Sequence, residues 1–145
     1  MSKTTPALPV HEVRAAAAYY RDLFGFEAVY VADDFARLVR DDAELHLWGA
    51  MDDDWPARED LRARPVCSGA ESFLAGTGSC RIEVADVDAL FGEFQPQGLL
   101  HDASRGVHAT GFGTREFSAV DLDGNLLTFY RRVESTEDDR FPPSS

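Results

Sequence analysis

The chain contains few cysteines and few basic side chains, and each shortage argues against a class of function. Its 145 residues include only Cys67 and Cys80, with no CxxC pair and no Cys/His array, so neither a zinc site nor a disulfide framework is indicated. Fourteen Lys and Arg stand against 26 Asp and Glu, which gives a net charge of −12. Because nucleic acids are bound through clustered Lys and Arg, we expect no nucleic-acid partner.

Long hydrophobic segments are also missing. No apolar run approaches 18 residues, and the opening MSKTTPALPV lacks the apolar core of a secretory signal. We therefore expect a cytoplasmic protein without a membrane partner. The 44% hydrophobic content, with 2 Trp, 4 Tyr and 10 Phe, is nevertheless enough for a sizeable core in one domain.

The common catalytic signatures do not occur. His11-Glu12 lacks the second His of HExxH, and no GxSxG elbow is present. The stretch Gly111-Phe112-Gly113-Thr114 lacks the Gly-Lys-Ser/Thr ending of a phosphate-binding loop. We therefore predict no catalytic residue from motifs.

The first third of the chain predicts a strand, a helix and three more strands. In the predicted helix, apolar residues recur at spacings of three and four, and Gly25 follows as a natural stop. Aspartate pairs at 33–34 and 41–42 mark turns between the later strands. The predicted elements are the strand Ala7–Val10, the helix Glu12–Phe24 and the strands Glu27–Val31, Phe35–Arg40 and Glu44–Trp48.

The last third repeats this order. The predicted elements are the strand Ser79–Val84, the helix Val87–Phe94 capped by Asp86, a strand beginning at Leu99–Leu100, a loop at Gly106–Gly113, and the strands Arg115–Val120 and Leu126–Arg132. We predict a single domain over residues 1–132, with half-modules at about 5–50 and 78–132 joined by 51–77. Residues 133–145 are polar and acidic, and we expect them to form a flexible tail.

Two terminal segments carry a family resemblance. Near the start lies EVRAAAAYYRDLFGF, and near the end GTREFSAVDLDGNLLTFYRR, in which Asp123-Gly124-Asn125 is a tight-turn signature. Together with DDFARLVRDDAELHLW and GSCRIEVADVDALFGEF, these segments resemble the vicinal oxygen chelate superfamily of glyoxalases, bleomycin-resistance proteins and dioxygenases. The resemblance is closest to the bleomycin-resistance branch.

The resemblance implies an α+β fold in which paired βαβββ modules form a curved mixed sheet around a cleft. Enzymes of the superfamily bind a divalent metal there through four strand residues. Carried onto this chain, the four positions are Thr5, His46, Ser79 and Thr128. Only His46 could ligate well (Glu44, if the alignment is off by two), and a divalent metal needs about three N, O⁻ or S⁻ ligands. We therefore predict no metal site and no cofactor.

The resistance branch further implies a homodimer that sequesters a bleomycin-like antibiotic, which is large, flat and cationic. Aromatic side chains stack on the rings of such a ligand, and acidic side chains meet its positive tail. A proline near the N-terminus lets the first strand exchange between subunits, and Pro6 occupies the matching place here. A metal-independent binding protein is thus favoured over an enzyme.

Strand alternation and the resemblance together select the candidate ligand-binding residues. Phe35, Trp48 and Phe112 are the expected stacking rings, with Asp34 and Glu44 facing positive charge. Arg115 is expected to fix the start of its strand or to line the rim of the cleft. The full set is Asp34, Phe35, Glu44, His46, Trp48, Arg81, Glu83, Phe112, Arg115, Thr128 and Tyr130. The alternating residues on the other faces are expected to form the core against the helices: Leu45, Leu47, Cys80, Ile82, Val84, Leu127 and Phe129.

Several alternatives stay open at this point. The charged face bearing Arg81 and Glu83 could be an ordinary solvated sheet face, and Glu83 or Glu44 could form a structural ion pair with Arg81. The chain could also be a divergent metal-dependent lyase, isomerase or dioxygenase that uses His46 with a carboxylate. A structural or regulatory interaction module without a small ligand is the third possibility.

Overall fold

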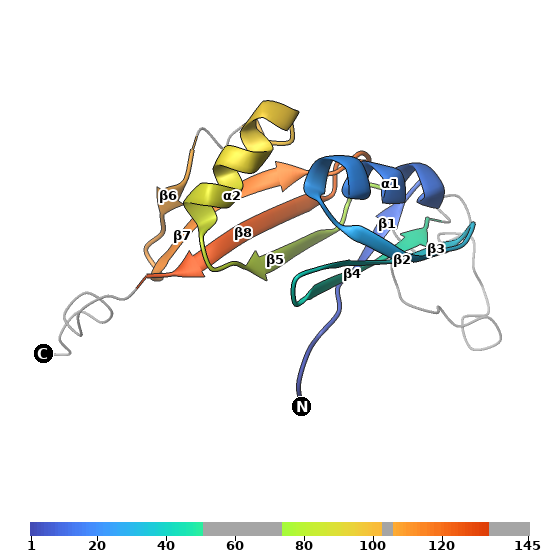
Figure 1. Ribbon diagram of the computed structural model, residues 1–145, viewed down its shortest axis with the longest axis horizontal. Helices are drawn as coiled ribbons and strands as arrows, with labels where there is room; N and C mark the ends of the chain where they lie inside the picture. Colours follow the sequence, from blue (N-terminus) through green and yellow to red (C-terminus); the bar gives the residue numbers. More distant parts are fainter. Residues whose placement is uncertain (51–73, 103–105, 134–145) are drawn as a thin grey trace, which may run out of the picture. The chain divides into compact units, whose positions relative to one another are not determined.

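The computed structural model describes residues 1–50, 74–102 and 106–133 (Figure 1). The chain divides into two compact units, Met1–Cys80 with Val120–Leu126, and Arg81–Ala119 with Leu127–Ser145. Each unit is described on its own. The greater part of the predicted connection at 51–77, almost all of the predicted tail, and Cys67 lie outside the described residues.

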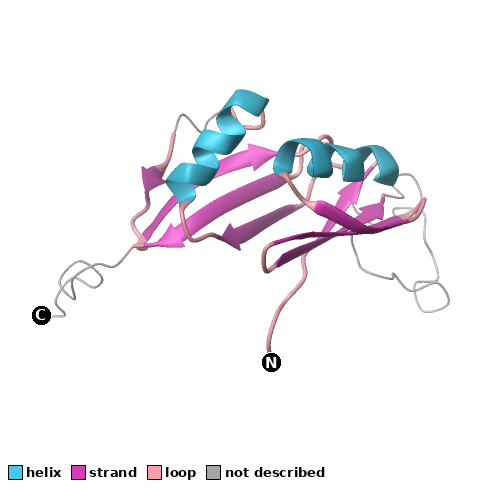
Figure 2. Cartoon of the chain, in the orientation of Figure 1, coloured by secondary structure: helices cyan, strands magenta, loops and turns pink. Residues whose placement is uncertain are grey.

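The first unit contains a four-stranded mixed sheet with one helix (Figure 2). The strand order is β1-β4-β3-β2, where β1 runs parallel to β4 and the other neighbours are antiparallel. Its elements are β1 Ala7–Val10, α1 Val13–Tyr19, β2 Glu27–Val31, β3 Phe35–Arg40 and β4 Ala43–Gly49. The predicted order is confirmed, with β1, β2 and β3 at the predicted bounds and β4 one residue longer at each end.

The predicted helix Glu12–Phe24 is present as two pieces, α1 and a π-helical turn, with Glu12 as the N-cap of α1. The Glu12 carboxylate accepts hydrogen bonds from the backbone N–H groups of Arg14 and Ala15 at 3.2 and 2.7 Å, which satisfies donors of the first turn. The last turn, Tyr20–Phe24, widens into a π-helical turn and stops at Gly25, whose φ of 76° suits glycine. The buried side of this helix supplies much of the core of the unit: Val13, Ala16, Ala17, Tyr20 and Phe24.

A buried polar network ties the turn at 121–125 into the first unit. The Tyr20 hydroxyl donates to the Asp121 carboxylate at 2.8 Å, and the Asn125 amide donates to the same carboxylate and to the Pro9 carbonyl. Burial, followed by the Asp121 charge, raises the pKa of Tyr20 well above its usual value, so this hydroxyl stays a donor. Gly124 has a φ of 99°, which confirms the tight turn predicted there.

The second sheet has the order β5-β8-β7-β6 and carries the second helix. Its elements are β5 Ser79–Glu83, α2 Val87–Phe94, a 3₁₀ turn at Gln95–Gln97, β6 His108–Ala109, β7 Thr114–Val120 and β8 Leu126–Arg132. β6 and β7 pair in antiparallel fashion. Backbone bonds from Leu126 to Gly78 and from Val84 to Tyr130 join equivalent ends of β5 and β8, so these two strands run parallel.

Phenylalanine rings form the core beneath α2. The rings of Phe94 and Phe117 lie 5.3 Å from that of Phe129, and Phe91 meets Phe117 at 5.4 Å between centroids. The Asp86 carboxylate accepts from the backbone N–H of Ala89 at 3.0 Å, which confirms the predicted cap.

One predicted strand lies elsewhere. Leu100 makes only an isolated bridge to Ala119, and Leu99 is fully buried as a core residue. The strand is instead β6, inside the stretch predicted as a loop at Gly106–Gly113. A two-residue strand is too short to show an alternating pattern, which is why the sequence does not reveal it.

The element order is therefore βαβββ in both halves, and the fold is α+β as predicted. The arrangement of the two modules around a cleft stays a prediction. None of the helices among the described residues has both the length and the apolar character needed to span a membrane.

Candidate functional site

The alternation predicted for β4 and β5 is present. Leu45 and Leu47 are fully buried, whereas Glu44, His46 and Trp48 between and beside them are partly exposed. On β5, Ser79, Arg81 and Glu83 are exposed, and Cys80 and Ile82 are half-buried. In each unit the candidate residues of these strands thus share one side of the sheet, away from the buried side chains.

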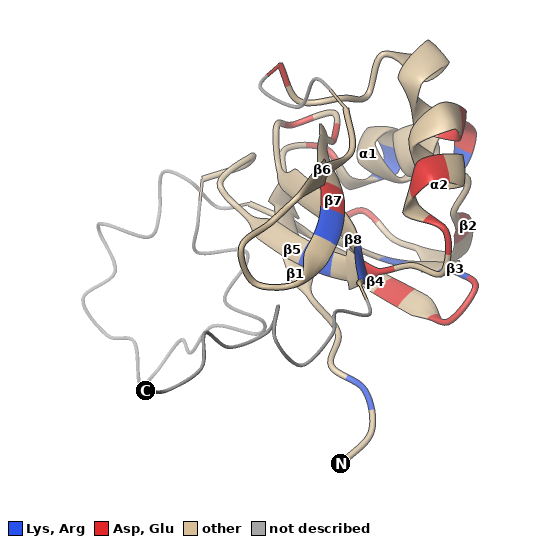
Figure 3. Cartoon of the chain, turned by 90° about the vertical axis from the view of Figure 1, so that its left-hand side faces the viewer, with Lys and Arg blue, Asp and Glu red and all other residues tan. Residues whose placement is uncertain are grey.

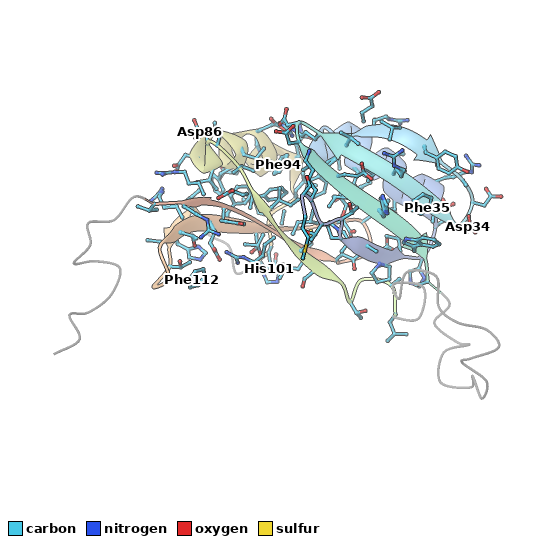
Figure 4. All side chains as sticks on the ribbon, turned by 90° about the horizontal axis from the view of Figure 1, so that it is seen from below. Asp34, Phe35, Asp86, Phe94, His101 and Phe112 are labelled. Atoms are coloured by element: carbon cyan, nitrogen blue, oxygen red, sulfur yellow. The ribbon has the colours of Figure 1, made fainter. Side chains whose placement is uncertain are left out.

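Four aromatic side chains gather on the open face of the first sheet, and we call Tyr30, Phe35, His46 and Trp48 the aromatic surface. Phe35 is its centre, with ring centroids 4.7 Å from Trp48, 5.0 Å from His46 and 6.0 Å from Tyr30. The β3–β4 register places Phe35 directly opposite Trp48, so these two predicted rings do meet. Figure 4 shows Phe35 beside Asp34 where β3 begins.

Tyr30 is a member of this surface that sequence reasoning missed. The pairing of β2 with β3 shifts between Ala28 and Tyr30, so that Ala28 opposes Leu38 and Tyr30 opposes Arg37. This β-bulge breaks the simple alternation along β2 and brings Tyr30 to the side of the sheet that carries Phe35. Simple alternation from Ala28 would have placed Tyr30 on the opposite, core side.

The Glu44 carboxylate on this surface is already paired. Arg37 donates two hydrogen bonds to it at 3.1 and 3.3 Å, and the Nε2 atom of His46 lies 2.7 Å away. The hydrogen bond from Arg37, followed by that from His46, lowers the pKa of Glu44 to about 2. Glu44 therefore carries a charge that Arg37 largely neutralises, which makes it a poorer partner for a ligand cation than predicted.

Asp34 is the predicted acidic residue that keeps its charge available. It lies in the bend between β2 and β3, and its side chain is exposed. Its neighbour Asp33 pairs with Arg14 at 2.8 Å, whereas no side chain among the described residues pairs with the carboxylate of Asp34. An exposed carboxylate next to Phe35 can approach the positive charge of a ligand that stacks on the ring.

In the second unit, a cluster forms around Arg81. Its guanidinium group donates to the Glu116 carboxylate at 2.7 and 3.4 Å. The same group lies 4.7 Å from the ring centre of Tyr130 and 5.5 Å from that of Phe112. Thr114 donates to Glu116 at 2.9 Å. Figure 3 marks the basic positions on β5, β7 and β8 in blue. We call Arg81, Phe112, Thr114, Glu116 and Tyr130 the Arg81 cluster.

The ion pair expected for Arg81 involves a different carboxylate. Arg81 binds Glu116, and Glu83 pairs instead with Arg132 at 3.3 Å. The reason is that β8 lies between β5 and β7, so an arginine on β5 reaches over Tyr130 of β8 to β7. Sequence reasoning missed Glu116 as a site residue. The signal was available, because Phe117 and Ala119 point to the core and alternation along β7 then puts Glu116 on the other face.

Within the second unit, Arg115 lies apart from the candidates Arg81, Phe112 and Tyr130. Arg115 pairs with Asp88 of α2 at 2.8 Å, and it shares its side of β7 with Phe117 in the core. Thr128 is nearly buried and bonds to the Ser118 hydroxyl at 3.0 Å. Arg115 therefore lies on the helix side of its sheet, away from the cluster around Arg81.

Three observations describe the potential metal ligands and the thiol in the described part of the chain. No group of three or more His, Cys, Asp and Glu side chains is placed there to hold a metal ion. His46, the best predicted ligand, is bonded to Glu44. Burial, followed by the Asp121 charge, raises the pKa of Cys80 to about 12, so this thiol stays protonated at neutral pH.

Two βαβββ modules, each with a polar or aromatic sheet face opposite its helix, define an α+β class of proteins. The chain belongs to the Glyoxalase/Bleomycin resistance protein/Dioxygenase superfamily, whose family model matches residues 4–129.

Individual relatives agree with this membership. A bleomycin resistance protein of Geobacillus stearothermophilus is 39% identical over 135 residues, which cover 93% of this chain and all of the relative. Among solved structures, a bleomycin resistance determinant encoded on the transposon Tn5 aligns with a TM-score of 0.66 at 22% identity, over 91% of this chain and 98% of the other. A bleomycin-binding protein from Streptomyces verticillus, complexed with copper(II)-bleomycin, gives a TM-score of 0.62 at 24% identity over 93% and 98%. The two structures share the fold of this chain.

Proposed function

We propose that this chain binds and sequesters a bleomycin-type antibiotic, or a similar flat cationic ligand, and thereby confers resistance. The observation that carries the proposal is the aromatic surface, where Phe35 touches Trp48, His46 and Tyr30 on an open sheet face. The relative at 39% identity, named as a bleomycin resistance protein, supports the same ligand class.

In this proposal, ring stacking and electrostatic attraction both contribute to ligand binding. A flat heteroaromatic ring gains contact area on Phe35 and Trp48, and aromatic pairs contribute about 0.5–1.5 kcal/mol beyond the area they bury. The exposed carboxylate of Asp34 attracts the positive tail of the ligand. Phe112, 66% exposed in the second unit, offers a further ring for stacking.

The predictions of a homodimer and of a cytoplasmic location belong to the same proposal. A dimer of two 16.0 kDa chains would have twice that mass in sedimentation equilibrium. Binding without a protein-held metal is also proposed, on the ground that three of the four positions carried over from the family are hydroxyl side chains, Thr5, Ser79 and Thr128.

The test is a calorimetric titration of the metal-stripped full chain with bleomycin. We expect saturable binding of one ligand per subunit, and an affinity about tenfold lower for Phe35→Ala because a central stacking ring is lost. Leu122→Ala, which removes an exposed side chain outside the aromatic surface, is the matched control and should bind like the unchanged protein.

Two results would contradict the proposal. The first is no binding by the metal-stripped protein. The second is equal affinity in the Phe35→Ala variant, which would remove the aromatic surface from the site. Binding that returns only with added divalent metal would favour the enzyme alternative built on His46.

A further inference from the structure

Phe112 is an exposed ring on a loop that offers it little support. The loop joins β6 to β7, and Gly111 and Gly113 flank the ring. A Cβ atom built on either glycine would meet nothing within 4 Å, and Gly113 has a φ of 85°. Figure 4 shows Phe112 at the tip of this loop, away from Phe94 on α2. Such a ring would lose considerable freedom on binding a ligand unless something in the protein already holds it.

Arg81 is the group that contacts this ring. Its guanidinium carbon lies 5.5 Å from the centre of Phe112 and 4.7 Å from that of Tyr130, both within the range of about 6 Å for a cation–π contact. Tyr130 belongs to β8 and is therefore part of the rigid sheet. Arg81 thus links the exposed ring of the loop to a ring of the sheet.

The guanidinium group is itself fixed by Glu116. Two hydrogen bonds join the planar group to the carboxylate, at 2.7 and 3.4 Å. A two-point bond of this kind sets the orientation of an arginine as well as its position, which a lysine cannot reproduce. The side chain of Glu116 is only 11% exposed, so the sheet holds the carboxylate in place.

The same carboxylate also reaches the base of the loop. The Thr114 hydroxyl donates to Glu116 at 2.9 Å, and the hydroxyls of Thr110 and Thr114 lie 2.7 Å apart. The Thr110 N–H donates to the Thr114 carbonyl at 2.9 Å, which closes the loop. Glu116 therefore connects the base of the loop, through Thr114, with its tip, through Arg81.

We propose that Arg81 is a positioning residue which, held by Glu116, fixes the ring of Phe112 so that the ring is ready to stack on the ligand. This inference rests on the proposed ligand-binding function and adds a mechanism for one of its surfaces. Arg81 acts through Phe112, because a ring that is already ordered binds a flat ligand at a smaller entropic cost.

The first experiment observes the ring without any ligand. The full chain carries 4-fluorophenylalanine at position 112, and its ¹⁹F NMR resonance is compared with those of Arg81→Met and Glu116→Gln. We expect both substitutions to shift the resonance towards that of the unfolded chain, since each releases the ring. An unchanged resonance in Arg81→Met would overturn the proposal.

Arg132 provides the matched control. It is another arginine of this sheet, 5.9 Å from Tyr130, but it pairs with Glu83 and its side chain is 74% exposed. Arg132→Met removes the same charge without touching Phe112, and we expect it to leave the resonance in place. A shift as large as that of Arg81→Met would show an effect of net charge alone and would also overturn the proposal.

The second experiment is a double-mutant cycle with bleomycin as the ligand. We expect about a fivefold loss of affinity for Arg81→Met and about a tenfold loss for Phe112→Ala. Because Arg81 acts through Phe112, the double variant should lose no more than Phe112→Ala alone. Losses that multiply to about fiftyfold would show that Arg81 binds the ligand independently and would sink the positioning role.

The two experiments separate the two proposals. If the unchanged protein does not bind bleomycin, the proposed function fails, and the ¹⁹F comparison alone decides whether Arg81 positions Phe112. If the protein binds bleomycin but the resonance is insensitive to Arg81, the function stands and the positioning role is wrong. Unfolding curves in urea confirm that each variant is folded before either measurement.

Discussion

At the scale of single residues, Glu44 shows how neighbours decide what a side chain on the aromatic surface can do. Arg37 from the adjacent strand and His46 from the same strand both bond to its carboxylate. Their bonds lower its pKa to about 2, so the carboxylate is ionised but already paired. The Asp34 carboxylate, which has no partner among the described residues, is better placed to attract a cation.

Removal of Arg37 should release the pKa of Glu44. Since the hydrogen bond from Arg37 is the largest cause of the lowered value, we expect Arg37→Met to move the pKa from about 2 upward toward 4.5, with His46 holding it somewhat below. The measurement is a ¹³C NMR titration of the Glu44 carboxyl carbon. Arg14→Met, which frees Asp33 instead, is the control and should leave the Glu44 titration unchanged.

The lowered pKa of Glu44 also determines how the stability of the protein depends on pH. The folded pKa is lower than the unfolded one, so pairing stabilises the folded state above pH about 4.5, and this contribution is lost as the pH falls through about 2. In Arg37→Met this stabilising contribution should be smaller, and its loss should be complete at a higher pH. A Glu44 titration that stays at about 2 in the variant would show that Arg37 does not hold the carboxylate in solution.

The sequence could predict the side of a strand on which each residue lies, but it could not predict the partner of that residue on a neighbouring strand. Alternation correctly put Glu44, His46 and Trp48 on one side of β4, because the period of a strand is two. The partner of Arg81 depends on which strand lies next to β5 and in what register, and these are long-range facts. Glu116 was therefore missed as the partner of Arg81, because it lies 35 positions away along the chain.

At the scale of elements, local signals explain where the prediction succeeded. β2, β3, α2 and β8 have the predicted bounds because each is flanked by glycine, aspartate pairs or a capping residue. β6 has only two residues and owes its existence to the neighbouring strand β7. The bulge in β2 likewise depends on its pairing with β3, and no local pattern announces it.

Replacement by alanine should change the stability of the protein in opposite directions at Gly76, which lies in a turn, and at Gly92, which lies in α2. Gly76 has a φ of 82°, and a Cβ atom there would meet the backbone carbonyl of Asp123. We expect Gly76→Ala to destabilise the protein by about 2–4 kcal/mol, from left-handed strain and overpacking together. The free energy of unfolding in urea measures the loss.

Gly92 in α2 is the matched control. Nothing lies within 4 Å of a Cβ atom at this position, and the backbone is helical. Since glycine is less favourable than alanine inside a helix, Gly92→Ala should stabilise the protein by about 0.5–1 kcal/mol. Equal effects of the two substitutions would mean that the close approach of Gly76 to Asp123 does not exist in solution.

At the scale of the whole molecule, the net charge of −12 is compatible with the positively charged ligand of the proposed function. A field of one sign raises the rate at which an oppositely charged ligand arrives, and it has little influence on how long the ligand stays. The aromatic surface provides contact at short range, where salt has little effect. The proposed function therefore separates into a salt-dependent encounter and a salt-resistant stacking step.

Salt should slow the binding of bleomycin without hastening its release. The Debye length falls from about 10 Å at 0.1 M to about 3 Å at 1 M, so the attraction is screened over this range. In stopped-flow measurements we expect the association rate to fall several-fold to about tenfold, while the dissociation rate stays nearly constant. Asp34→Asn should flatten this dependence, because it removes the exposed carboxylate beside Phe35. If the association rate of the unchanged protein did not depend on salt, binding would rest on stacking alone and Asp34 would not belong to the site.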